Sequence, residues 1–154
     1  MCSELQHEVI RLRERVNERL GELVPPEDAP PEQLHKAIRY SLVAPGKRIR
    51  PLMTLLTATR LGGDVEVGLD PACAVEMIHT ASLIVDDMPF MDDAEMRRGR
   101  PANHRVFGQD VAALAAFDLV SRAFGTLAGA RGLDDTQRTE LVRLLSEALA
   151  GEGV

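Results

Sequence analysis

Apolar residues recur at helical intervals through most of this 154-residue chain. In residues 3–23 they fall three or four positions apart and charged residues fill the opposite face, which is typical of an amphipathic helix. Comparable patterns predict further helices at residues 31–43, 51–61, 70–85, 109–129 and 134–150. No segment of convincing length alternates as a strand does. The sequence therefore predicts an all-α fold, and its length suits a single domain over residues 1–154.

The core of such a fold must consist mainly of aliphatic side chains. Hydrophobic residues make up 45% of the chain, whereas aromatic residues make up 3%. This composition favours packed helices over a β-sandwich. Residues 109–129 carry almost no charge, so we expect this helix to be buried in the core or in a subunit interface.

Short polar and proline-containing segments predict where several helices begin and end. Asp70 is a suitable N-cap for the apolar helix at 70–85, with Pro71 at its first position. Either Asp134 or Asp135 is expected to cap the last helix. Pro89 lacks an amide donor and disfavours helical geometry at the preceding residue, so it predicts a break soon after the apolar helix.

Charge and cysteine content exclude several classes of protein. A net charge of −6 argues against general nucleic-acid binding. Cys2 and Cys73 form no metal-binding spacing, so a reducing, cytoplasmic setting is expected. Residues 1–24 lack the uncharged core of a signal peptide, and we expect no membrane span.

The stretch from His79 to His104 contains the chain's densest cluster of charge. Acidic side chains follow the apolar helix directly, at Asp86, Asp87, Asp92, Asp93 and Glu95. Basic side chains come next, at Arg97, Arg98 and Arg100. Carboxylates this dense repel one another unless cations neutralise them, and hard oxygen ligands suit Mg²⁺. Guanidinium groups bind phosphate oxygens bidentately. The local prediction is a Mg²⁺–diphosphate site, and the alternative is a solvated acidic loop.

The position of Pro89 affects how the aspartates could meet. In a regular helix Asp86 and Asp92 would point about 240° apart around the axis. A loop at residues 88–91 could bring both carboxylates to one metal cluster. His79 lies two turns before Asp86 near the same helix face, although a histidine there could equally be a satisfied core residue.

A basic turn further upstream, GKRIRP, is a second candidate anion site. Gly46 permits close approach of the backbone, and Lys47, Arg48 and Arg50 are expected to converge on one turn. The alternative interpretation is a solvated basic turn.

Together, GKRIRP and IHTASLIVDDMPFMDDAEMRRGRP closely resemble the motifs of the trans-isoprenyl diphosphate synthases, or polyprenyl synthetases. The flanking text, including ALAAFDLVSRAFGTLAG, is most similar to bacterial geranylgeranyl diphosphate synthases of carotenoid pathways. The resemblance implies an antiparallel helical bundle, the N-terminal half of the isoprenoid synthase fold. It implies a Mg²⁺-dependent prenyltransferase that condenses isopentenyl diphosphate with dimethylallyl, geranyl or farnesyl diphosphate. No protein nucleophile is expected.

The resemblance also implies a role for each motif residue. The residues implied to hold Mg²⁺ on the allylic diphosphate are Asp86, Asp87 and Asp92. Arg97 is implied to contact the same allylic diphosphate. Isopentenyl diphosphate is implied to bind at Gly46, Lys47, Arg50, His79 and Arg98. Product length is expected to depend on Ala81 and Ser82, because both are small and lie about one turn before Asp86, which favours geranylgeranyl diphosphate.

The chain departs from that family in length. The later helices of that family carry a Lys-Thr pair, a Phe-Gln pair and a second DDxxD motif, and they have no counterpart in this chain. The chain is therefore expected to be the N-terminal part of an enzyme, one subunit of a homodimeric or heteromeric synthase, or a diphosphate-binding protein without catalysis. A Mg²⁺-dependent helical diphosphatase is disfavoured, because a hydrolase needs no second diphosphate site.

Overall fold

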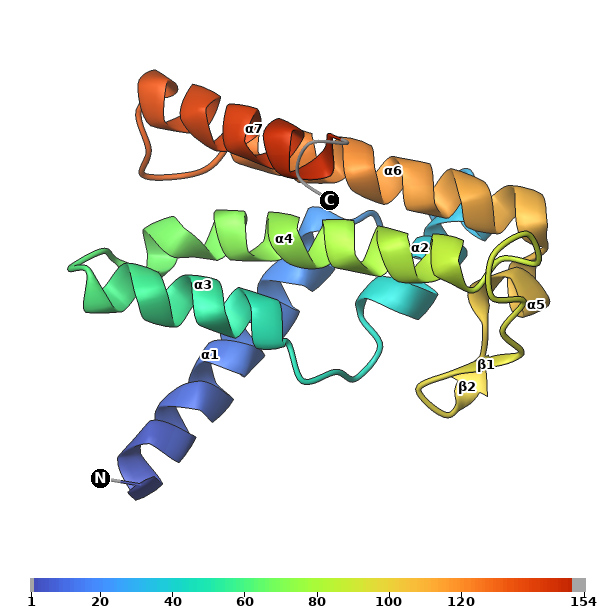
Figure 1. Ribbon diagram of the computed structural model, residues 1–154, viewed down its shortest axis with the longest axis horizontal. Coiled ribbons are helices and arrows are strands. Elements are labelled where there is room, and N and C mark those ends of the chain that lie inside the picture. The colour runs from blue at the N-terminus through green and yellow to red at the C-terminus, as the bar shows by residue number, and fades with distance from the viewer. Residues whose placement is uncertain (1, 151–154) are drawn as a thin grey trace.

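The computed structural model describes the backbone of residues 2–150, and this part of the chain is a helical bundle with one small hairpin (Figure 1). The helices are α1 (Cys2–Leu23), α2 (Glu32–Leu42), α3 (Ile49–Arg60), α4 (Val65–Asp86), α5 (Asn103–Phe107), α6 (Gln109–Ala128) and α7 (Asp135–Leu149). The strands β1 (Met96–Arg97) and β2 (Arg100–Pro101) pair antiparallel. The predicted all-α fold is confirmed, with the hairpin as a small addition.

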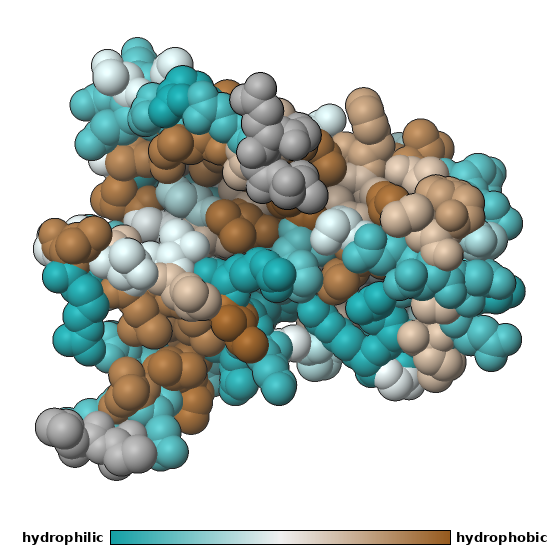
Figure 2. All heavy atoms as spheres, viewed as in Figure 1, coloured by the Kyte–Doolittle hydropathy of each residue, from teal (hydrophilic) through white to brown (hydrophobic). Residues whose placement is uncertain are grey.

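Helix α4 lies at the centre of the bundle. It packs between α6 on one side and α3 on the other, and both neighbours run antiparallel to it (Figure 1). As predicted, the core is mainly aliphatic, and its largest fully buried side chains include Leu20, Ile38, Leu42, Leu55, Met77 and Leu119. Hydrophobic side chains also reach the surface along the boundary between α4 and the α6–α7 pair (Figure 2).

The predicted start of α4 is wrong. The helix begins at Val65, and its cap is Asp64, whose carboxylate accepts from the Glu66 amide at 2.7 Å. Asp70 instead lies buried inside the helix, where it accepts from Arg19 Nε at 2.7 Å. Pro71 is therefore an interior residue that removes one helical donor. A tertiary ion pair occupies the carboxylate that would otherwise cap the helix.

The other predicted boundaries agree more closely with the structure. Helix α4 ends at Asp86, before Pro89, as the proline requires. Asp134 caps α7 and forms a capping box with Gln137.

Helix α6 is buried on one face only. Leu114 and Phe117 are exposed, Phe117 by 73%. Among the described residues, α6 is the one helix long and apolar enough to cross a membrane by length and composition, a test that core helices of soluble proteins also pass. From the sequence we expected no helix to pass this test; the buried face of α6 packs on α4.

Candidate functional site

The chain folds back on itself directly after α4. The Asp92 amide donates to the Asp86 carbonyl oxygen at 2.9 Å, and the Ala94 amide donates to the Asp87 carbonyl oxygen at 3.2 Å. Asp92 therefore lies against the end of the helix instead of continuing its axis. Asp86 is half-buried and Asp92 is exposed. The loop thus brings the first and last aspartates of the motif together through their backbones.

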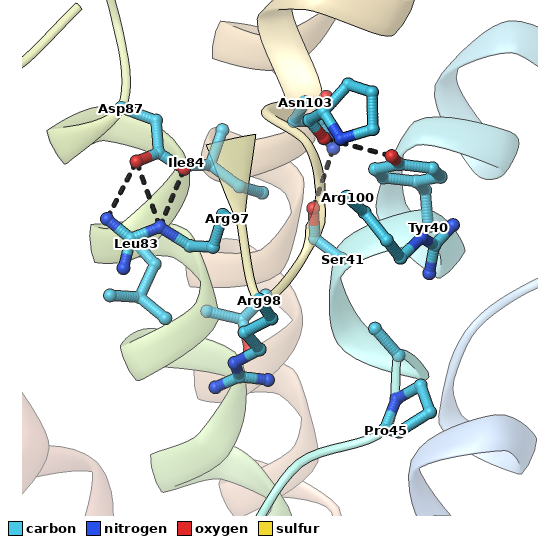
Figure 3. Close-up of a pocket in the computed structure, with 13 residues that line it drawn as sticks. Tyr40, Ser41, Pro45, Leu83, Ile84, Asp87, Arg97, Arg98, Arg100 and Asn103 are labelled. Carbon is cyan, nitrogen blue, oxygen red and sulfur yellow. Dashed lines mark hydrogen bonds and ion pairs between the residues drawn. The ribbon is translucent and has the colours of Figure 1, made fainter. Parts of the chain in front are cut away.

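Asp87 has a different environment. Its buried carboxylate accepts from Arg97 Nε at 2.8 and 2.9 Å and from Arg97 Nη2 at 2.7 Å (Figure 3). These bonds raise the pKa of Arg97. Asp87 and Asp86 also border different cavities. Within residues 4–150, no three His, Cys, Asp or Glu side chains are grouped to hold a metal ion together. The metal-binding role of Asp87 stays a prediction, and its structural role is to hold Arg97.

The basic turn is only partly as expected. Arg48 borders the same cavity as Lys47 and Arg50, but its side chain is buried, with φ of 52°. Its guanidinium donates to Asn17 Oδ1 and Glu76 Oε1, and to the carbonyl oxygens of Leu42 and Ala44, each at 2.8 Å. Arg48 therefore connects this turn to α1 and α4, and most of its donors bind groups within the protein.

The remaining basic residues do come together. A cavity of about 350 Å³ lies beside this turn, and its walls include Gly46, Lys47, Arg50, His79 and Arg98. These are the five residues for which the sequence predicted one binding site. They come from the α2–α3 turn, from α3, from α4 and from the hairpin. Three cationic side chains facing one cavity make it suitable for a polyanion.

His79 contributes as a neutral group. Burial, followed by the charge of Arg50, lowers the pKa of His79. Arg50 Nη1 lies 3.1 Å from His79 Nε2. Since a guanidinium can only donate, His79 Nε2 accepts, and a hydrogen on Nδ1 completes the neutral ring. His79 thus orients Arg50 at the mouth of the cavity.

Gly46 is needed for the position of Arg98. A Cβ atom at residue 46 would lie 2.9 Å from Arg98 Nη1, closer than a side-chain contact allows. We expect Gly46→Ala to displace the Arg98 guanidinium and to weaken binding of inorganic diphosphate about tenfold, the order of one charge-assisted hydrogen bond. Gly125→Ala is the matched control, because its Cβ would enter open space. Calorimetric titration measures both, and equal affinities would contradict this role for Gly46.

An apolar groove of about 420 Å³ lies between α4 and α6, and Asp86 forms part of its wall. Ala81 and Ser82 line this groove, as expected from their position before Asp86. Phe90 and Phe117 also line it and are largely exposed. The arrangement can hold an extended apolar chain whose anionic end lies near the aspartates.

Three features of this site were not predicted from the sequence. They are the Asp87–Arg97 ion pair, the inward turn of Arg48, and Tyr40, whose hydroxyl donates to the Pro101 carbonyl oxygen at 2.9 Å. Each depends on contacts between residues far apart in the chain. For Tyr40, the sequence signal was a tyrosine in the predicted helix just before the basic turn.

Comparisons with known proteins identify the family of this chain. The sequence model of the polyprenyl synthetase family matches residues 31–152. The chain is 45% identical over 149 residues to the heterodimeric geranylgeranyl pyrophosphate synthase large subunit 1 of Arabidopsis thaliana, covering 95% of this chain and 40% of that protein. It is 49% identical over 141 residues to a geranylgeranyl diphosphate synthase of Pantoea ananas, covering 90% and 46%.

Solved structures show the same fold. An FPP/GFPP synthase from Zymomonas mobilis superposes with a TM-score of 0.92 at 33% identity, covering 99% of this chain and 55% of that one. A geranylgeranyl pyrophosphate synthetase from Pyrococcus horikoshii gives 0.86 at 35% identity, covering 95% and 43%. The chain spans less than half the length of the curated relatives named above.

Proposed function

Because the chain belongs to the polyprenyl synthetase family, we propose that it takes part in prenyl transfer, in which isopentenyl diphosphate condenses with an allylic diphosphate to give geranylgeranyl diphosphate. One observation carries this proposal. A cationic cavity and an apolar groove lie along the same helix, α4, with Asp86 bordering the groove and His79 the cavity. Two diphosphates and one growing apolar chain need such an arrangement.

The cationic cavity would bind isopentenyl diphosphate. Lys47, Arg50 and Arg98 supply the positive charge, and neutral His79 holds Arg50 in place. The allylic diphosphate would bind beside Asp86, Asp92 and Arg97. Nη1 of Arg97 donates to no described residue, so Arg97 can contact a diphosphate oxygen while Nε and Nη2 stay on Asp87.

The aspartates fit Mg²⁺ only as part of its coordination shell, which phosphate oxygens and water would complete. Proteins usually hold Mg²⁺ through one or two carboxylates together with phosphate oxygens and water. Asp86 and Asp92 can provide two such carboxylates, whereas Asp87 is already bound to Arg97. When bound, Mg²⁺ would neutralise charge on the leaving diphosphate. A second carboxylate set would have to come from outside the described residues.

The chain's own residues then favour ionisation of the allylic C–O bond. Diphosphate leaves with the bonding electrons, and Arg97 stabilises the negative charge that develops on it. The double bond of isopentenyl diphosphate attacks the allylic cation, and the new cation loses a proton to the released diphosphate. His79 serves as an orienting group in this scheme, because its Nε2 already accepts from Arg50.

Product length would depend on the groove below Asp86. The small side chains of Ala81 and Ser82 leave room for a chain longer than farnesyl, which supports geranylgeranyl diphosphate. The Ser82 hydroxyl is satisfied by the His79 carbonyl oxygen at 2.8 Å, so it adds no unpaired polar group to the groove.

The groove is open to solvent along Phe90 and Phe117. A partner surface would complete it, either a second copy or a different subunit; one relative is by its name a heterodimer subunit. A diphosphate-binding role without turnover is the second candidate, because the chain spans less than half of its relatives. The diphosphatase alternative is disfavoured by the separate cationic cavity.

A prenyltransferase assay on the purified chain tests the proposal. It contains Mg²⁺, labelled isopentenyl diphosphate and, in parallel, dimethylallyl, geranyl or farnesyl diphosphate, with products resolved by length. If the wild-type chain turns over, we expect Asp86→Ala to abolish turnover. If it only binds diphosphate, we expect Asp86→Ala to abolish the Mg²⁺-dependent binding. Asp28→Ala, an exposed carboxylate in the α1–α2 linker, is the matched control. The proposal fails if wild type neither turns over nor binds diphosphate.

A further inference from the structure

The β1–β2 hairpin carries three arginines, and each has a different environment. Arg97 binds the Asp87 carboxylate at the C-terminal end of α4. Arg98 borders the cationic cavity. Arg100 lies over the Tyr40 ring of α2, with its guanidinium carbon 3.9 Å from the ring centroid. Figure 3 shows Arg97 and Arg100 on opposite sides of the hairpin. The hairpin therefore bridges α4 and α2, and the arginine between these two contacts reaches a candidate binding site.

The location of Arg98 depends on the hairpin backbone. Arg98 and Gly99 form the two-residue turn between the strands, and both have positive φ, 53° and 76°. Arg98 is exposed, and within residues 4–150 no carboxylate lies at ion-pair distance from it. Its guanidinium is close to Gly46 because the turn carries it there. A shift of the hairpin relative to α2 would therefore move this charge away from the cationic cavity.

Tyr40 binds the backbone of the hairpin. Hydrogen-bonded and non-hydrogen-bonded pairs alternate along an antiparallel ladder. The Ala102 amide donates to the Glu95 carbonyl oxygen at 2.9 Å. The next pair toward the turn, Met96 with Pro101, is therefore a non-hydrogen-bonded one. The carbonyl oxygen of Pro101 points away from β1, and the Tyr40 hydroxyl donates to it at 2.9 Å. This bond holds β2 against α2.

Helix α2 also leads into the other wall of the cationic cavity. Tyr40 lies in the last turn of α2, shortly before Gly46 in the α2–α3 turn. Just beyond β2, Asn103 Nδ2 donates to the Ala37 carbonyl oxygen and to Ser41 Oγ of α2, both at 2.8 Å. Among the described residues that line the cationic cavity, Tyr40 is absent. Tyr40 can therefore affect this cavity only through the two walls that it joins.

We propose that Tyr40 is a positioning residue for diphosphate binding in the cationic cavity. Its hydroxyl fixes β2 on α2 and so keeps the Arg98 guanidinium beside Gly46. This inference rests on the proposed function, because it takes diphosphate as the ligand of that cavity. Arg97 has a separate support in Asp87, so the effect of Tyr40 falls on Arg98.

Tyr40→Phe tests the proposal, because it removes the hydroxyl and keeps the ring under Arg100. Inorganic diphosphate is titrated calorimetrically into the 154-residue chain without Mg²⁺. We expect about two- to tenfold weaker binding, the value of one neutral hydrogen bond. Thr139→Val is the matched control, since its hydroxyl donates to the Asp135 carbonyl oxygen at 2.7 Å on α7, outside the cavity. Unchanged affinity in Tyr40→Phe, or an equal loss in the control, would overturn the proposal.

Double variants distinguish positioning of Arg98 from a general effect on the fold. In an Arg98→Gln background, Tyr40→Phe should cause no further loss of affinity, because the group that it positions is already removed. In a Lys47→Gln background it should keep its full effect, since Lys47 lies on the α2–α3 turn and not on the hairpin. The same loss in both backgrounds would contradict a role through Arg98.

Amide hydrogen exchange of residues 96–102 measures the anchoring without any ligand. Exchange of these amides should be faster in Tyr40→Phe than in wild type, and unchanged exchange would refute the anchoring role. If wild type binds no diphosphate while exchange is faster in Tyr40→Phe, the proposed function fails and the anchoring role of Tyr40 stands. If wild type binds diphosphate and Tyr40→Phe binds it equally well, this inference fails and the proposed function stands.

Discussion

Arg48→Met is expected to destabilise the protein by about 3–5 kcal/mol, the usual cost of removing one partner of a buried ion pair. Arg48 and Glu76 are both nearly inaccessible to water and are joined at 2.8 Å. The variant leaves the buried Glu76 carboxylate without its partner. It also removes the donors for two carbonyl oxygens, those of Leu42 and Ala44. A domain of this size is stable by only about 5–15 kcal/mol, so the loss is a large fraction of the total.

Urea unfolding followed by circular dichroism measures this change. Arg143→Met is the matched control: Arg143 pairs with Glu140 and Glu147, but all three side chains are about half exposed, so only a small loss of stability is expected. The double variant Arg48→Met/Glu76→Gln should recover part of the loss, because no buried charge is then left unpaired. A loss for Arg48→Met as small as that for Arg143→Met would show that the buried pair does not stabilise the fold.

Arg48 also shows what could not be predicted from the sequence. The helical periodicity and the prolines predicted the number, order and approximate bounds of the long helices, because those depend on local patterns. In the motif GKRIRP, however, Lys47, Arg48 and Arg50 are equivalent as cations. Only the tertiary structure distinguishes them, since Glu76 and Asn17 are brought to Arg48 by α4 and α1.

Asp70 is a second case of this kind. Its position before Pro71 is a good local signal for a helix start, but Arg19 of α1 and the Arg131 amide both bind its carboxylate. The helix therefore extends back to Asp64, the next available cap. Long-range pairing displaced a local preference at both positions. The residues around the cationic cavity could be grouped from the sequence because they occur in motifs, and their role in binding stays a prediction.

The Asp87–Arg97 pair leads to the other prediction with a large effect. If Asp87 positions Arg97, then Asp87→Asn releases the guanidinium and weakens inorganic diphosphate about 10- to 100-fold, the value of one hydrogen bond to a charged group. The Mg²⁺ concentration that gives half-maximal binding should stay unchanged. By contrast, Asp86→Ala should remove the dependence of diphosphate binding on Mg²⁺. Titrations of diphosphate at a series of Mg²⁺ concentrations measure both quantities.

Arg97→Lys provides the complementary test. Lysine keeps the positive charge but cannot bind Asp87 through two parallel donors. Arg97→Lys should therefore lose most of the diphosphate affinity that Asp87→Asn loses. The double variant should be no weaker than either single variant, because both remove the same geometry. A raised Mg²⁺ requirement in Asp87→Asn would instead make Asp87 a metal ligand that leaves Arg97 when the site fills. The buried, bidentate contact at 2.7 to 2.9 Å favours the positioning role, since breaking it would strand a carboxylate that is 3% exposed.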